Sequence, residues 1–221
     1  MTALTELLAY LIYTALGLIA LWGAFTVVMT WRRVGQVRFR DEAEQDELLA
    51  EVDSSVRSGR VDAAAELCAD DARALPQLVI LAATNRQLPL GKLSTLLAER
   101  FRRDVLADLD HRISWIDTVI KSAPMIGLFG TVIGMMGAFG KLAGEAKENV
   151  SPSILANDIS LALITTACGL AIAIPLVLAR ASIMTRIRQM EDLVGSGLVQ
   201  LLEAFRAAGS RGSGGGQGES Q

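Results

Sequence analysis

The chain has 221 residues, of which 51% are hydrophobic and 20% are charged, with a formal net charge of -3. This composition excludes a disordered protein, a small disulfide scaffold and a protein that binds nucleic acid through high positive charge. Charge is absent from three long stretches: residues 7–31, 122–140 and 159–179. A membrane-spanning helix needs about 20 predominantly apolar residues, so the pattern predicts an all-α membrane protein with three transmembrane helices.

The first stretch, residues 7–31, is expected to be a retained helix and not a cleaved signal peptide. Residues 1–6 contain no basic residue, and two arginines, not a small-residue cleavage site, follow Trp31. The apolar run also exceeds the roughly 7 to 15 residues of a signal-peptide core. Tyr10, Tyr13 and Trp31 suit positions near the membrane interfaces, where aromatic side chains gather.

Basic residues near the ends of the spans predict the orientation. Residues 32–121 and 180–208 carry arginines or lysines close to the spans, whereas residues 1–6 carry none and residues 141–158 carry only two lysines. The positive-inside rule therefore places residues 1–6 and the loop 141–158 outside. It places the other two segments, and with them the C-terminus, in the cytoplasm.

The segment 32–121 is too long to be a linker and is predicted to form a helical domain in the cytoplasm. Apolar residues recur at helical spacing in 41–57, and 61–74 also has a helical pattern. Pro76 and Pro89 are expected to mark breaks. A long amphipathic stripe over 93–120 predicts one helix that runs directly into the second span.

The last part of the chain is predicted to leave the membrane as a helix. The apolar stripe of the third span continues into residues 180–208, which we expect to form a cytoplasmic helical extension. Residues 209–221 are rich in glycine and serine and are expected to be a disordered tail.

Few groups in the sequence are able to carry out chemistry. Cys68 and Cys168 fall in different predicted compartments and are expected to be reduced packing residues. His111 is the single histidine, and a metal site needs clustered ligands. The phosphate-loop, serine-hydrolase and zinc-protease motifs do not occur in the sequence. We therefore expect no enzyme, no metal, no cofactor and no nucleic-acid partner.

The second span carries a face of small residues. Gly130 and Gly134 form a GxxxG pair, which Gly127 and Gly137 extend. Helices in lipid associate through close backbone approach at such residues, so the four glycines predict helix packing. Pro124 is expected at the entry to the second span, where its missing N–H costs least.

The third span carries hydroxyl side chains at Ser160, Thr165 and Thr166. These side chains can bond their own helix backbone, bond a neighbouring helix or line a wet path, and residue physics alone favours backbone bonding. Pro175 is expected to kink the helix and to belong with the packing residues. Asp158 is expected to cap the helix, with the preceding asparagine as the alternative cap and an ion-entry role as a second possibility.

Two of these segments resemble those of one protein family. Residues 127–135 (GLFGTVIGM) are similar to the glycine-rich second span of the MotA/TolQ/ExbB proton-channel family, and residues 163–175 (LITTACGLAIAIP) are similar to its third span. The three-span order, the external N-terminus and the long cytoplasmic segment resemble the ExbB/TolQ branch, since MotA-type stators have four spans. The motif match covers about residues 110–180, and the loop 41–100 matches in size and helical character only.

The resemblance implies a homopentamer in the bacterial inner membrane, with the second and third helices around a central pore. It implies two copies of a single-span partner of the ExbD/TolR kind inside that pore. The partner's membrane Asp would be protonated and deprotonated as protons cross. Work would pass to a transducer of the TonB or TolA kind and drive processes such as energised transport across the envelope.

Four hydroxyl residues become candidates for the proton pathway under this resemblance. Thr131 and Thr166 match the two pore-facing threonines of the family pattern, and Thr165 and Ser160 are their neighbours on the third span. Leu161 departs from the pattern, because many ExbB and TolQ proteins carry a membrane Glu five residues before the threonine that matches Thr166. The third span therefore has no carboxylate of its own.

Two other hypotheses remain open from the sequence. The first is a non-conducting oligomeric membrane scaffold or anchor that associates through its glycine face and recruits cytoplasmic proteins through its helical loop. The second is a sodium-driven member of the same family. Proton flux separates the scaffold from the channel, because a scaffold needs no ionisable partner in its pore.

Overall fold

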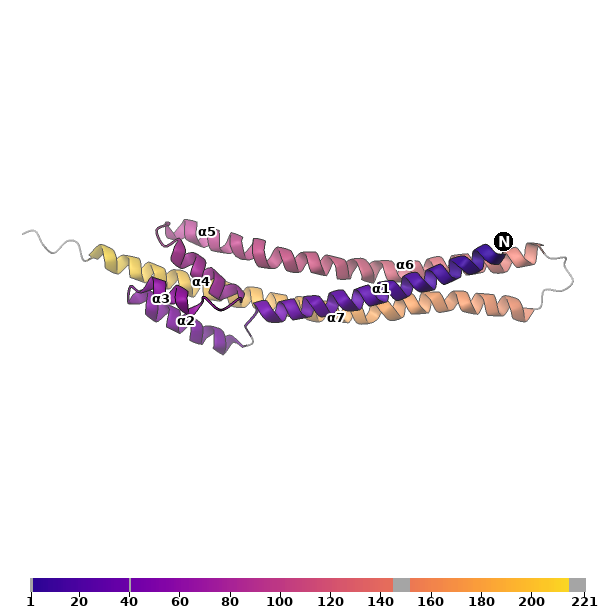
Figure 1. The fold of residues 1–221 in the computed structure, drawn as a ribbon, viewed down its shortest axis with the longest axis horizontal. Coiled ribbons are helices and arrows are strands. Elements are labelled where there is room, and N and C mark those ends of the chain that lie inside the picture. The colour runs from indigo at the N-terminus through magenta and orange to yellow at the C-terminus, as the bar shows by residue number, and fades with distance from the viewer. Residues whose placement is uncertain (1, 40, 145–151, 215–221) are drawn as a thin grey trace, which may run out of the picture. The chain divides into compact units, whose positions relative to one another are not determined.

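A computed structural model describes residues 2–39, 41–144 and 152–214, with side chains described over 7–39, 41–140 and 155–208. All regular secondary structure in these ranges is helical, as predicted (Figure 1). In chain order the elements are α1 (Thr2–Val37), α2 (Glu42–Arg57), α3 (Val61–Leu67), α4 (Ala74–Thr84), α5 (Leu90–Phe101), the π-helical turn η1 (Arg102–Leu106), α6 (Ala107–Gly144) and α7 (Pro152–Gly214).

Three helical stretches are long and apolar enough to cross a membrane. They include most of α1, α6 and α7, which have 36, 38 and 63 residues. A helix rises 1.5 Å per residue, so about 20 residues cross the hydrocarbon core and each of these helices continues beyond it. The predicted spans 7–31, 122–140 and 159–179 all lie inside these helices.

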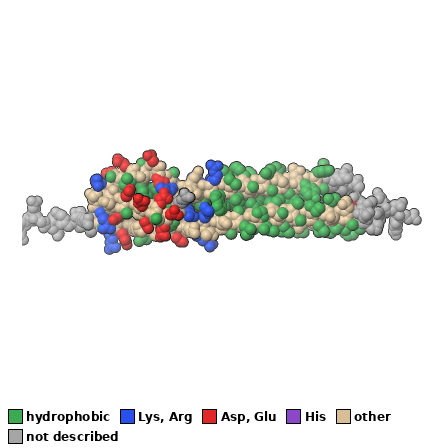
Figure 2. All heavy atoms as spheres, turned by 90° about the horizontal axis from the view of Figure 1, so that it is seen from below, with side chains coloured by type: hydrophobic (Ala, Val, Ile, Leu, Met, Phe, Trp, Pro, Cys, Tyr) green, Lys and Arg blue, Asp and Glu red, His purple; other side chains and the backbone are tan. Residues whose placement is uncertain are grey.

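The chain divides into two compact units. The first comprises residues 1–30 and 112–182, in which segments of α1, α6 and α7 pack together. Its buried side chains are mostly small, such as Ala123 and Ala162, while large apolar side chains such as Met125 and Leu178 are about two-thirds exposed, at 68% and 65%. Figure 2 shows this apolar surface in green. An apolar exterior around a core of small residues suits lipid, not water.

The second unit comprises residues 31–111 and 183–221. Within it α2, α3, α4 and α5 contact one another in sequence. Its core contains the cluster of Phe39, Leu49 and Leu75. Charged side chains gather on its surface (Figure 2), as on a water-soluble domain.

The extension of α7 packs into the second unit. Its predicted apolar stripe is buried at four positions: Ile183, Ile187, Met190 and Val194. The helix continues to Gly214, into the segment for which we predict disorder, and residues 215–221 lie outside the described residues. Of the predicted external loop 141–158, residues 145–151 also lie outside them.

Three expectations about helix ends are wrong. Pro76 does not break a helix but lies in the first turn of α4, where its missing N–H has no intrahelical partner to lose. Pro124 lies near the start of the predicted span but in the interior of α6, which begins at Ala107, so its missing N–H does remove an intrahelical hydrogen bond. Asp158 does not cap α7, because this helix begins at Pro152 and places Asp158 in its second turn.

The predicted long helix over 93–120 is confirmed. Residues 90–144 are helical throughout, with α5 passing through η1 into α6. The π-helical turn η1 contains one more residue than an α-helical turn. The extra residue rotates the faces of α6 relative to those of α5.

We predict that Gly197→Leu destabilises the second unit. A Cβ at Gly197 would lie 2.9 Å from Cδ2 of Leu75 and 3.2 Å from Nε2 of Gln45, which is itself buried and donates to the carbonyl of Leu193 at 2.7 Å. Overpacking of this kind costs about 1–3 kcal/mol. The measurement is the thermal unfolding midpoint of the detergent-solubilised protein.

Gly195→Leu on the same helix is the matched control. A Cβ at Gly195 meets nothing within 4 Å, and loss of a helical glycine is itself stabilising. Equal midpoints for the two variants would contradict the packing of α2 and α4 against this turn of α7.

Candidate functional site

The glycines of α6 lie directly against α7. A Cβ at Gly127 would lie 2.6 Å from the carbonyl oxygen of Thr165, and a Cβ at Gly134 would lie 2.5 Å from Cβ of Ala162. A Cβ at Gly130 would overlap the Thr165 hydroxyl. Any side chain larger than hydrogen at these positions would push the two helices apart.

Gly169 of α7 also belongs to this interface, although it was not among the residues predicted from the sequence. A Cβ at Gly169 would lie 2.5 Å from the carbonyl oxygen of Ala123 and 3.2 Å from Cα of Pro124. The signal was present in the sequence, since Thr165, Gly169 and Ala173 form a small-residue repeat at intervals of four. We refer to the contact between these residues of α6 and α7 as the α6–α7 seam.

Thr165 lies inside the α6–α7 seam. From the sequence it was predicted to line the proton pathway. It is 4% exposed, and its Oγ1 lies 2.9 Å from the carbonyl oxygen of Gly127 and 2.7 Å from that of Ala162. The hydroxyl therefore donates both across the seam and back to its own helix. In the single chain this is a packing role.

Thr131 and Thr166 occupy the same stretch of the seam. The Thr131 hydroxyl is bonded to its own helix, donating to the carbonyl of Leu128 at 2.7 Å. The Thr166 backbone packs at Gly127, one helical turn from Thr131 along α6. The two threonines of the family pattern are thus brought to within about one turn of each other.

Thr166 differs from its neighbours in its hydrogen bonding. Its side-chain oxygen is buried but makes no hydrogen bond to any group that the structure describes. Leaving a buried hydroxyl unsatisfied costs about 1–3 kcal/mol, so this donor is available to a group outside the chain. It is the feature of the seam that packing alone does not explain.

The remaining predicted residues are spread around the same unit. Ser160 is exposed on α7, and Pro175 lies in the interior of that helix. Gly137 lines a cavity together with Gly130 and Gly134. No group of three or more potential metal ligands is present in the described part of the chain.

An ion pair joins α6 and α7 beside their apolar segments. Arg180 on α7 pairs with Asp117 on α6, with Nη2 3.0 Å from Oδ2 and a further contact through Nε. Both side chains are about one-third exposed, at 37% and 29%. In the sequence Arg180 indicates only the orientation of the third span, because opposite charges near the ends of two spans do not show that the two side chains are in contact.

The second unit contains the buried thiol of Cys68 and, three residues further along the chain, the ion pair between Asp71 and Arg73. Hydrogen bonds from Arg73 hold the pKa of Asp71 below its usual range. The Arg73 guanidinium also forms an ion pair with Glu44 at 2.6 Å and stacks 3.9 Å above the Phe39 ring. Burial, with the nearby Asp71 charge, raises the pKa of Cys68 to about 11. This thiol is therefore a poor nucleophile at neutral pH.

Comparison with known proteins identifies the family. Residues 80–195, more than half of the chain and including the whole seam, match the MotA/TolQ/ExbB proton channel family. The chain belongs to this family. With its three apolar helices, it is a membrane protein of the ExbB/TolQ-like branch.

Three relatives illustrate the similarity. The Tol-Pal system protein TolQ of Haemophilus influenzae is 38% identical over 91 residues, 41% of this chain and 39% of that protein. The biopolymer transport protein ExbB of Neisseria gonorrhoeae is 32% identical over 92 residues, 42% of this chain and 41% of that protein. TolQ of Pseudomonas aeruginosa is 41% identical over 71 residues, 32% and 30% of the two chains. The matches span less than half the length of each relative.

We predict that Gly134→Leu opens the seam. The leucine would displace Ala162 of α7, and overpacking of this size costs about 1–3 kcal/mol or more. A lower thermal midpoint and a changed oligomer size on a native gel are the expected results. Gly140→Leu, on the same helix with nothing within 4 Å of its Cβ, should leave both unchanged.

We also predict that Cys68 resists thiol reagents in the folded protein. A pKa of about 11 leaves roughly a hundredfold less thiolate at neutral pH than an ordinary cysteine, and the side chain is fully buried. In a Cys168→Ala background, maleimide labelling should begin only on unfolding. Rapid labelling of the native protein would show that the helices around Cys68 open readily.

Proposed function

We propose that this chain is the channel subunit of an ExbB/TolQ-like, proton-driven complex. The observation that carries the proposal is the buried, unpartnered hydroxyl of Thr166, on the helix and in the family-matched segment where a pore-facing threonine is expected. A hydroxyl that is buried without a partner among the described residues is suited to a partner that arrives from outside.

The proposed mechanism is transient hydrogen bonding to a carboxylate carried by a second protein. One charge crossing the membrane potential yields about 2.3 kcal/mol per 100 mV. A bare carboxylate in the membrane is costly, so it must meet donors where it ionises. Thr166 supplies an O–H that is not otherwise used, and the Thr131 oxygen, which already donates to Leu128, can accept from the protonated acid. No covalent bond is made or broken, so the chain is not proposed to be an enzyme.

The partner and the assembly follow from the branch to which the chain is similar. We propose a homopentamer in the inner membrane, with an external N-terminus, residues 32–121 in the cytoplasm and a single-span partner of the ExbD/TolR kind in the pore. Leu161 is 48% exposed on α7 and carries no charge. We therefore propose that the partner's acid carries the transported proton at the membrane depth of Leu161. A transducer of the TonB or TolA kind would then pass on the energy.

The scaffold alternative has less support. It requires the glycine face to associate with other copies, whereas Gly127, Gly130 and Gly134 are already in contact with α7 of the same chain. Association of copies must then use other surfaces, such as the exposed apolar side chains of α6 and α7.

The test is Thr166→Val in the complex reconstituted with its single-span partner in vesicles. Loss of a hydrogen bond to a charged group is worth about 1.5–3 kcal/mol, so proton flux should fall by at least about tenfold. Copy number by native mass spectrometry and the thermal midpoint should not fall, because the removed hydroxyl makes no hydrogen bond to the part of the chain that the structure describes.

Thr14→Val is the matched control. Thr14 is exposed on α1 and its hydroxyl donates to the carbonyl of Tyr10, so its loss should leave flux unchanged. Full flux in Thr166→Val would refute the hydroxyl role. An oligomer that conducts nothing and retains no single-span partner would favour the scaffold.

A further inference from the structure

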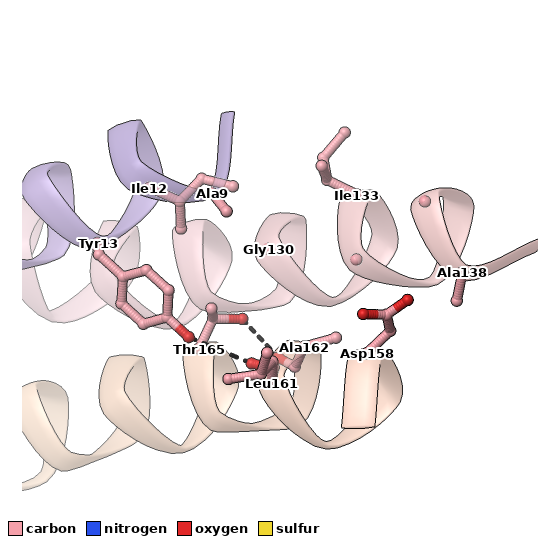
Figure 3. A pocket seen from close by; sticks show the side chains of 12 residues that line it. Ala9, Ile12, Tyr13, Gly130, Ile133, Ala138, Asp158, Leu161, Ala162 and Thr165 are labelled. Carbon is pink, nitrogen blue, oxygen red and sulfur yellow. Dashed lines mark hydrogen bonds between the residues drawn. The ribbon is translucent and has the colours of Figure 1, made fainter. Parts of the chain in front are cut away.

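A cavity of about 260 Å³ lies within the first unit, between α1, α6 and α7 (Figure 3). Small residues create it, because Ala9 on α1, Gly134 and Gly137 on α6 and Ala162 on α7 leave space that larger side chains would fill. At about 30 Å³ for each water in the liquid, the volume has room for several water molecules. It is distinct from the unbonded Thr166 hydroxyl, which does not line it.

Three polar side chains line this cavity: Tyr13, Asp158 and Thr165. Figure 3 shows Tyr13 entering from α1 at one end and the Asp158 carboxylate at the other. The Tyr13 hydroxyl donates to the carbonyl of Leu161 at 3.3 Å, which leaves its oxygen able to accept. Empty cavities in proteins are apolar, whereas a cavity of this size with a carboxylate and two hydroxyls is suited to hold ordered water.

The polar groups are arranged along one face of α7. Asp158, Ala162 and Thr165 follow at intervals of four and three, so all three face the cavity. Asp158 and Thr165 are separated by about 10 Å along the helix axis, a distance that a short file of hydrogen-bonded waters spans. Ala162 packs directly against Gly134 on α6, so the space along this face lies on the side toward α1.

Asp158 is the one charged side chain among the described residues that line the cavity, and Tyr13 is the other titratable group there. The lining residues of α6, Ile133 and Ala138 together with three glycines, carry no ionisable group. A carboxyl group in contact with confined water is suited to exchange a proton with it, as the Asp and Glu residues of membrane proton relays do.

We propose that this cavity is a hydrated proton-binding site within a single protomer, in which Asp158 holds the proton and Tyr13 and Thr165 accept hydrogen bonds from the water. In the exchange the Asp158 carboxyl gives its proton to a water molecule and becomes a carboxylate, and the reverse transfer restores it. The inference rests on the proposed function in one respect, because the proton held here is one that the channel passes.

The test combines infrared difference spectroscopy with proton flux, both on the complete complex in vesicles. Spectra at acidic and neutral pH should show a carboxyl C=O band that Asp158→Asn removes. Asp192→Asn, at an exposed residue of the other unit, should keep the band. Flux in Asp158→Asn should fall by about a hundredfold, the low end for loss of a proton-transfer group.

A second variant fills the cavity and leaves the carboxylate in place. Ala9→Leu should displace the water, shift the carboxyl band and reduce flux, whereas Ala24→Leu, on an exposed face of the same helix, should do neither. Ala9 lies on α1 and not in the α6–α7 seam, so its substitution leaves the packing of the seam in place. This variant therefore still tests the inference if Asp158→Asn fails to assemble.

The outcomes separate the two proposals. Unchanged flux in both Asp158→Asn and Ala9→Leu, in a complex that conducts, would overturn the cavity site and leave the proposed channel intact. Absence of the Asp158 carboxyl band would overturn the site whether or not the complex conducts. A wild-type complex that conducts nothing would refute the channel, and the infrared band alone would then decide whether Asp158 binds a proton.

Discussion

Close approach of two helix backbones, those of α6 and α7, is the constraint on which the candidate site depends. Gly127 and Gly134 on one helix and Gly169 on the other leave no room for a Cβ. Lipid supplies no hydrophobic force between helices, so association depends on dispersion contacts and interhelical hydrogen bonds, which only close approach permits. The glycines therefore set the register of α7 on α6, and with it the direction of every side chain near the seam.

That register gives two adjacent threonines different roles. Successive residues of a helix point about 100° apart, so α7 cannot turn both into the same contact. Thr165 lies in the seam and donates to the carbonyl of Gly127, whereas the Thr166 oxygen is buried without a partner in the described chain. The Thr165 hydroxyl bonds the two helices to each other, and the Thr166 hydroxyl keeps a donor that no described residue uses.

The same small residues that allow α6 and α7 to meet also leave space beside α1. Where a glycine or alanine faces another helix at a wider separation, the missing side chain becomes volume, and here that volume contains Asp158 and the Tyr13 hydroxyl. The small residues of α6 and α7 therefore account both for the close packing of these helices and for the polar cavity beside α1. The ion pair of Arg180 and Asp117 joins the same two helices beyond their apolar segments.

The sequence by itself determined the helical class, the three apolar spans, the small face of α6 and the resemblance at residues 127–135, because these depend on local composition and spacing. It placed Pro124 where a missing N–H costs least, whereas Pro124 lies in the interior of α6, since a local rule for proline does not register the contacts that keep a helix continuous. Only the tertiary structure decided that Thr165 packs while Thr166 stays unbonded, and that Asp158 faces a cavity instead of capping its helix. Helical periodicity defines which residues share a face, but which neighbour that face meets, and at what distance, depends on the packing of segments far apart in the chain.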